Sequence, residues 1–265
     1  MLSALIWDVD GTLAETEEHG HRVAFNRAFE EAGLTWRWDG AVYADLLAVA
    51  GGKERIHAWW RRIDPVGAAA PSARETIERL HARKTAHYLD ILAGGKIRLR
   101  SGVERLLLEA ANHGLKQAIA TTTTLQNVHR LLDVTLGADA STLFDVIAAA
   151  DTVGLKKPAP DVYHRVLGGL GLHASQCLAI EDSFAGVGAA RSAGVPVVLV
   201  RSRFTTPRPC ADCVEDLQDL NGVRLADLRR MHHVWQVVEA ARRNPPGAAS
   251  EPKATPSACA RPTAA

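Results

Sequence analysis

The sequence is poor in cysteine and contains no long apolar run. Only four cysteines occur in 265 residues, which is too few for a disulfide-based scaffold. No stretch of about 18 apolar residues occurs, so the sequence predicts no membrane-spanning helix and no membrane partner. The first eight residues lack the basic segment of a secretory signal. We therefore expect a reduced, cytoplasmic protein.

An excess of charge of either sign is also missing. Lys and Arg together number 31, Asp and Glu number 30, and the net charge is +1. This balance excludes the electrostatic footprint of a protein that binds nucleic acid or an anionic membrane surface. Hydrophobic residues make up 47% of the chain, enough to bury a full core. No segment predicts an obligate protein partner.

Short apolar runs alternate with helical patterns after about residue 100. The expected strands are residues 5–7, 116–121, 145–148, 177–180 and 196–200, and the expected helices are 125–132, 161–170 and 185–193. Strands bounded by Gly, Asp or Pro and followed by helices are typical of βαβ units. The sequence therefore predicts an α/β fold with a Rossmann-like parallel sheet.

Residues 15–95 differ from the rest, because only helical patterns occur there, at 21–32, 41–48, 54–62 and 71–92. An all-helical block between the first two strands predicts a cap domain at 15–95, inserted into a core of residues 1–14 and 96–243. The Pro-, Ala- and Ser-rich tail at 244–265 is expected to be disordered. Just before the tail, an apolar stripe predicts a helix packed on the core. It consists of Leu225, Leu228, Met231, Trp235 and Val238.

Residues 8–13 read DVDGTL and directly follow the first expected strand. Side chains alternate along a strand, so Asp8 and Asp10 point to the same face. Two carboxylates this close repel each other unless a cation lies between them, and Mg²⁺ is the cation that best suits oxygen ligands. Gly11 allows a sharp turn at the strand end. The pattern predicts a metal and ligand site where parallel sheets bind their ligands.

Three further motifs follow in order: Thr121, the segment KKPAPD at 156–161, and AIEDS at 179–183. Together with residues 8–13 they resemble the haloacid-dehalogenase-like phosphohydrolase superfamily. By this resemblance Asp8 is the nucleophile that forms an aspartyl-phosphate, and Asp10 is the general acid and base. Lys157 and Thr121 would stabilise the transferring phosphoryl group.

The same resemblance implies a Mg²⁺ site formed by Asp8, Asp10, Glu181 and Asp182. Neighbouring residues of a strand face opposite ways, so one of the pair at 181 and 182 is expected to bind the metal directly. We favour Asp182, with Glu181 acting through water or as a second ligand.

The expected cap contains a candidate anion site. Gly51 and Gly52 free backbone amides at the start of a helix, and Lys53 and Arg55 lie in its first turn. Backbone donors, the helix dipole and two cations favour a bound phosphate. The cap therefore points to a sugar phosphate or bisphosphate as substrate.

A closer resemblance is to the CbbY-type phosphatases, which hydrolyse xylulose 1,5-bisphosphate, an inhibitor of Rubisco, to xylulose 5-phosphate. It rests on residues 14–17, 24–26, 34–39, 51–55 and 120–124. It implies substrate contacts from Glu17, His21, the loop at 51–55, Thr122 and Thr123. The spacing leaves either His19 or His21 as the family's histidine, and the distance to Phe25 favours His21.

Three alternatives remain open. A phosphomutase of the β-phosphoglucomutase type would share the cap and both aspartates, whereas a non-enzymatic phospho-acceptor domain would be smaller and have no cap. Cys210 and Cys213, followed by His232 and His233, could bind zinc, although adjacent histidines lack the usual ligand spacing. The other interpretation is that these four residues are unrelated and that the cysteines are reduced.

Overall fold

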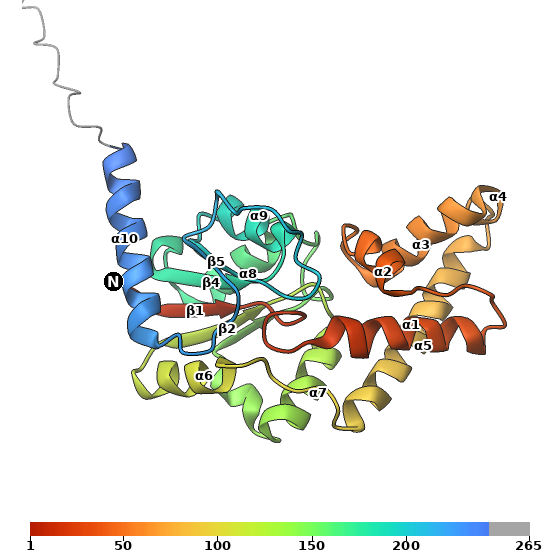
Figure 1. The fold of residues 1–265 in the computed structure, drawn as a ribbon, viewed down its shortest axis with the longest axis horizontal. Coiled ribbons are helices and arrows are strands. Elements are labelled where there is room, and N and C mark those ends of the chain that lie inside the picture. The colour runs from red at the N-terminus through yellow and green to blue at the C-terminus, as the bar shows by residue number, and fades with distance from the viewer. Residues whose placement is uncertain (244–265) are drawn as a thin grey trace, which may run out of the picture.

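The computed structural model describes residues 1–243, so the predicted disordered tail lies outside the described residues. Within them, the strands form a six-stranded parallel sheet in the order β3-β2-β1-β4-β5-β6 (Figure 1). The strands are β1 (Ala4–Trp7), β2 (Lys116–Ala120), β3 (Val146–Ala148), β4 (Cys177–Glu181), β5 (Val197–Val200) and β6 (Glu215–Leu217). The predicted α/β fold with a parallel sheet is confirmed. Strand β6 was not predicted.

Helices cover both faces of the sheet, and strand alternation decides which side chain meets which layer. Leu5 and Trp7 of β1 pack against the layer of α6 (Val103–Asn112), α7 (Leu125–Leu136) and α10 (Leu225–Arg243). Ala4 and Ile6 pack against α8 (Asp161–Leu170) and α9 (Phe184–Ser192). Both layers are apolar, as a central parallel strand requires. Short 3₁₀ turns at Ala140–Leu143 and Ala174–Gln176 complete these layers.

The segment between β1 and β2 is helical, as predicted, and lies at the carboxyl ends of the strands (Figure 1). Its elements are a π-helical turn at Glu17–His21, α1 (Arg22–Glu31), α2 (Gly40–Leu46), α3 (Gly52–Ile63), α4 (Pro65–Ala68) and α5 (Ala73–Ala93). The predicted helix ends differ from these by a few residues, and α4 was not predicted.

The helical segment has an apolar cluster of its own. Phe25, Phe29 and Trp38 form its centre, with ring centroids 4.6 Å apart for Phe25 and Trp38 and 4.9 Å apart for Phe29 and Trp38. Trp36 packs on Phe29 with centroids 5.4 Å apart. Trp36 and Trp38 therefore pack within the helical segment. A separate cluster is consistent with a cap, although the boundaries at 15 and 95 stay a prediction.

Helix α10 confirms only part of the predicted apolar stripe. Leu225 and Leu228 are buried in the core and Met231 packs against it, but Val238 is 42% exposed. The helix therefore packs on the core through its first turns and then leaves it.

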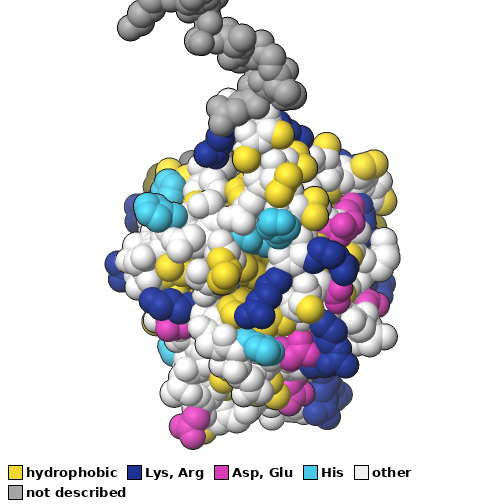
Figure 2. All heavy atoms as spheres, turned by 90° about the vertical axis from the view of Figure 1, so that its left-hand side faces the viewer, with side chains coloured by type: hydrophobic (Ala, Val, Ile, Leu, Met, Phe, Trp, Pro, Cys, Tyr) yellow, Lys and Arg dark blue, Asp and Glu magenta, His cyan; other side chains and the backbone are white. Residues whose placement is uncertain are grey.

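On the face shown in Figure 2, basic side chains are interspersed with apolar and acidic ones. Among the described helices, none is long and apolar enough to span a membrane.

Candidate active site

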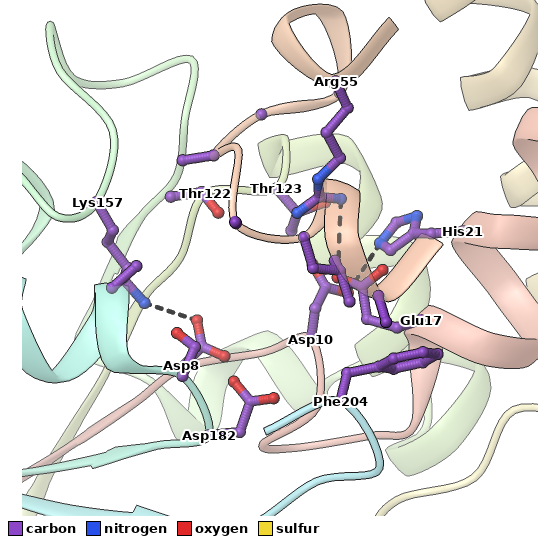
Figure 3. Close-up of a pocket in the computed structure, with 18 of the residues that line it drawn as sticks. Asp8, Asp10, Glu17, His21, Arg55, Thr122, Thr123, Lys157, Asp182 and Phe204 are labelled. Carbon is purple, nitrogen blue, oxygen red and sulfur yellow. Dashed lines mark hydrogen bonds and ion pairs between the residues drawn. The ribbon is translucent and has the colours of Figure 1, made fainter. Parts of the chain in front are cut away.

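A cavity of about 470 Å³ lies between the carboxyl ends of the strands and the helical segment. Its walls come from the end of β1, the π-helical turn, the start of α3, helix α5, and the loops after β2, β4 and β5 (Figure 3). Most residues predicted for the site line it: Asp8, Asp10, Glu17, His21, Gly51, Gly52, Arg55, Thr122, Thr123, Lys157 and Asp182. Distant motifs of the sequence therefore meet at one place.

Lys157 forms hydrogen bonds with groups at the ends of three strands at the base of the cavity. Its Nζ donates to Asp8 Oδ1 at 2.7 Å, to Glu181 Oε1 at 2.6 Å and to the Ala120 carbonyl at 2.8 Å. Burial alone would lower the pKa of Lys157, but the charges of Asp8 and Glu181 outweigh it and raise the pKa. Lys157 is therefore a fixed cation beside the Asp8 carboxylate.

Asp8, Glu181 and Asp182 form a buried carboxylate cluster whose ligand atoms all lie within 4.8 Å of one another. Burial raises the pKa of all three carboxyls, that of Glu181 to about 7 and that of Asp182 well above its usual range. Glu181 Oε2 has no hydrogen-bond partner among the described residues. Lys157 contacts two of these three buried carboxyls, so its single positive charge does not balance the negative charge of the cluster. An oxygen-only set of this kind fits Mg²⁺.

The Asp10 carboxylate stands apart from this cluster and faces the helical segment. Its Oδ1 accepts from Thr16 Oγ1 at 2.5 Å and lies 2.9 Å from His21 Nε2. Burial would raise the pKa of Asp10, but His21 and Thr16 lower it to about 2. These contacts hold the side chain of Asp10 toward the helical segment, and the predicted metal role of Asp10 has no support from its side-chain position.

His21 is the histidine at the cavity, whereas His19 is exposed. Its ring stacks on Tyr88 with centroids 3.9 Å apart, and its Nδ1 lies 2.8 Å from Lys84 Nζ. A protonated lysine can only donate, so His21 Nδ1 accepts and its Nε2 carries the proton toward Asp10. Burial lowers the pKa of Lys84 to about 8. Lys84 was not predicted, because nothing in the sequence distinguishes it from a surface lysine of α5.

The opposite wall of the cavity carries Arg55. Its Nε donates to the Val49 carbonyl at 2.9 Å, and its Nη1 lies 3.9 Å from Glu17 Oε1. Tyr43, which was not predicted, donates its hydroxyl to Glu17 Oε2 and packs below the Arg55 guanidinium. These contacts hold the half-buried Arg55 guanidinium at the cavity, on a different side from Lys157 (Figure 3).

Glycines are required where α3 begins. Gly51 has a φ of +99°, and a Cβ at Gly52 would lie 2.7 Å from the His81 ring. The structure does not bring Lys53 to this site, because its side chain is exposed and lines a separate surface cavity. Thr121 does not line the cavity either: it is buried, and its hydroxyl accepts from the Thr123 amide at 3.2 Å.

The cysteines correct one expectation. Cys210 and Cys213 are joined by a disulfide, so the prediction that they are reduced is wrong, whereas Cys177 is free and buried. A disulfide has no thiolate to offer zinc. His232 is engaged elsewhere, with its Nε2 2.9 Å from the Ser175 carbonyl. The zinc alternative is therefore wrong.

Comparison with known proteins agrees with these observations. The family model for haloacid dehalogenase-like hydrolases matches residues 2–194. Protein CbbY (plasmid) of Cupriavidus necator is 52% identical over 204 residues, which cover 77% of this chain and 80% of that protein. The structure of CbbY from Rhodobacter sphaeroides in complex with phosphate has a TM-score of 0.78 and 40% identity, covering 86% of this chain and 100% of that one. A mutant of the same protein, solved with xylulose 1,5-bisphosphate, is equally similar at a TM-score of 0.78 and 40% identity, covering 86% and 99%.

Proposed function

The chain belongs to the haloacid dehalogenase-like hydrolases and is a phosphatase of the CbbY type, and on this premise we propose that it is a Mg²⁺-dependent sugar-bisphosphate phosphatase. The proposed reaction converts xylulose 1,5-bisphosphate to xylulose 5-phosphate and phosphate. The relative solved with that ligand supports this choice. The same resemblance supports a cytoplasmic enzyme that removes an inhibitor of Rubisco.

The observation that carries the proposal is one cavity with two separate sites for a phosphate. At the core, Lys157 and the carboxylate cluster would hold the phosphoryl group that is transferred. At the helical wall, Arg55 and the free amides at the start of α3 would hold the second phosphate. A sugar that carries a phosphate at each end would occupy both sites at once.

Asp8 is the proposed nucleophile. Lys157 holds Asp8 Oδ1, which leaves the other carboxylate oxygen for attack on phosphorus. That oxygen forms a bond to phosphorus as the bond from phosphorus to the sugar oxygen breaks, and the product is an aspartyl-phosphate. Lys157 would balance the charge that builds up on the phosphoryl oxygens. When bound, Mg²⁺ would act as a Lewis acid on those oxygens, held by Asp8, Glu181 and Asp182.

Asp10 is the proposed proton carrier. Its carboxyl would give a proton to the departing sugar oxygen and then take one from the water that hydrolyses the aspartyl-phosphate. Contacts from Thr16 and His21 orient Oδ1 of Asp10 and favour the ionised carboxylate. The ionised carboxylate is the form that accepts a proton in the second step. Negative charge on the departing oxygen would raise the pKa of Asp10 in the first step.

The test compares Arg55→Ala with wild type on two substrates, xylulose 1,5-bisphosphate and an aryl phosphate that reaches only the core. A charge-assisted contact to phosphate contributes about 1.5–3 kcal/mol, so kcat/KM for the bisphosphate should fall by roughly one to two powers of ten. Hydrolysis of the aryl phosphate should change little. Arg61→Ala, an exposed arginine of the same helix, is the matched control. Equal losses on both substrates would mean that Arg55 is structural and would remove this support.

A further inference from the structure

The loop between β5 and β6 contains a C-x-x-C motif that the phosphatase reaction does not use. Cys210 and Cys213 form a disulfide across a four-residue turn and are half-buried. Ala211 and Asp212, the residues between them, are exposed. The disulfide therefore lies at the surface, where a reductant can approach. Exposed disulfides of this kind are the ones that are reduced most readily.

The same loop forms part of the cavity wall. Phe204, Thr205, Thr206 and Arg208 all line the cavity. The Arg208 guanidinium lies 3.9 Å above the ring of Phe184 at the start of α9, and it forms no ion pair among residues 1–243. Arg208 is thus an unneutralised cation at a cavity that is proposed to take a doubly anionic substrate.

Arg208 is anchored from two sides. Upstream, Arg201 forms two hydrogen bonds with Asp216 of β6, at 2.8 and 2.7 Å, and also donates to the Arg208 carbonyl at 2.8 Å. Downstream, only Pro209 separates Arg208 from Cys210, and both cysteines pack against the apolar layer of α8 and α9. Opening the disulfide would remove the cross-link that ties Cys210 to Cys213 and leave the upstream anchor intact.

We propose that Cys210 and Cys213 are a redox site for a dithiol reductant, and that their oxidation state sets the position of Arg208 and the affinity of the cavity for a bisphosphate. A thiolate of the reductant attacks one sulfur of the disulfide and forms a mixed disulfide, and the other cysteine leaves as a thiolate. The second thiol of the reductant then displaces the first cysteine. Two electrons pass to the protein, both cysteines take up a proton, and the reductant leaves as its own disulfide. The claim about affinity depends on the proposed substrate class.

The first experiment counts thiols. The full chain with Cys259→Ser is equilibrated in mixtures of reduced and oxidised dithiothreitol, and free thiols are then trapped with a maleimide and counted by mass. Two thiols should appear together in a single two-electron transition, while the buried Cys177 stays constant. A disulfide that the dithiol does not open in the folded protein would refute the redox site.

The second experiment measures affinity without relying on turnover of a sugar. The probe is pentane-1,5-bisphosphonate, which is not hydrolysed, used as a competitive inhibitor of aryl phosphate hydrolysis. Reduction should raise its inhibition constant by about tenfold, the effect of losing one charge-assisted contact, and change aryl phosphate hydrolysis by less than about twofold. Arg208→Ala should show the weaker inhibition in both redox states, and Cys210→Ser/Cys213→Ser should no longer respond to reductant.

The outcomes of these experiments distinguish the redox proposal from the proposed substrate class. An inhibition constant that is equal in both redox states refutes the control of affinity by the disulfide, even if the thiols titrate. A bisphosphonate that inhibits neither form refutes the proposed substrate class and the affinity claim with it, whereas the thiol count still decides the redox site.

Discussion

Replacing Gly11 with alanine tests how tightly the turn after β1 is packed against the carboxylate cluster. Gly11 has a φ of +84°, and a Cβ at this position would lie 2.1 Å from Asp182 Oδ2 and 2.7 Å from its Cγ. Gly33 offers a matched control, because its φ is +70° and a Cβ there would meet nothing within 4 Å. The two variants share the backbone strain, and only Gly11→Ala adds the steric overlap.

The expected losses of stability and activity follow from the backbone strain and from the steric overlap. A side chain in the left-handed region costs about 1–2 kcal/mol, so both variants should lose roughly that much free energy of unfolding. In Gly11→Ala the Asp182 carboxylate must also move by more than about 1 Å to restore ordinary contact. A displacement of this size at a reacting centre costs on the order of a hundredfold in rate. We therefore expect kcat/KM to fall about a hundredfold in Gly11→Ala and to stay near wild type in Gly33→Ala.

The assay is aryl phosphate hydrolysis at saturating Mg²⁺, with urea unfolding followed by circular dichroism on the same samples. Mg²⁺ binding measured by calorimetry provides a second readout, since a displaced Asp182 should weaken it. Unchanged activity in Gly11→Ala would refute the packing of Asp182 against this turn. An equal loss of activity in Gly33→Ala would mean that backbone strain alone is responsible.

Three further predictions concern other parts of the site. Asp8→Asn should fold normally by circular dichroism and lose several powers of ten in kcat, and retention of a tenth of the wild-type rate would exclude Asp8 as the nucleophile. Tyr43→Phe, which removes the hydroxyl donated to Glu17, should raise KM for the bisphosphate several-fold and leave aryl phosphate hydrolysis unchanged. Burial lowers the pKa of His81 from 6.5 to about 4, and the charges of nearby lysines add to this effect. The folded state therefore disfavours protonation of His81, so the stability that is present above pH 6.5 is lost as the pH falls toward 4. His81→Gln should therefore show a smaller drop in urea midpoint than wild type between pH 7.5 and pH 5, by up to about 2 kcal/mol in free energy, and an identical drop would contradict the shift.

The fold could be predicted from the sequence where an element is buried on both faces. Strands β1, β4 and β5 consist mainly of apolar runs that end at charged or turn residues, and β2 ends in a short apolar run, so their positions could be read directly. Strand β6 has the sequence EDL, and it lies at the sheet edge, where polar side chains face solvent. No apolar pattern marks such a strand. The last turns of α10 were misjudged because an apolar stripe does not reveal where its partner surface ends.

Some residues of the candidate site could likewise be predicted from the sequence, and others could not. Asp8, Lys157 and Asp182 follow strand ends within short motifs, and parallel strands bring their carboxyl ends to one edge. Lys84 and Tyr43 lie on helices with no local signal, and their role arises only when those helices pack beside Asp10 and Arg55. The Cys210–Cys213 pairing was missed because composition favours reduced cysteines when they are few, whereas a disulfide depends on the geometry of one turn.

The central claim is that this chain hydrolyses one phosphate from a sugar bisphosphate. The most direct measurement follows xylulose 1,5-bisphosphate by ³¹P NMR in the presence of wild-type enzyme and Mg²⁺. We expect one equivalent of inorganic phosphate and one of xylulose 5-phosphate, with no conversion by Asp8→Asn. An isomerised sugar phosphate without free phosphate would identify a mutase. No conversion under conditions where an aryl phosphate is hydrolysed would contradict the proposed substrate.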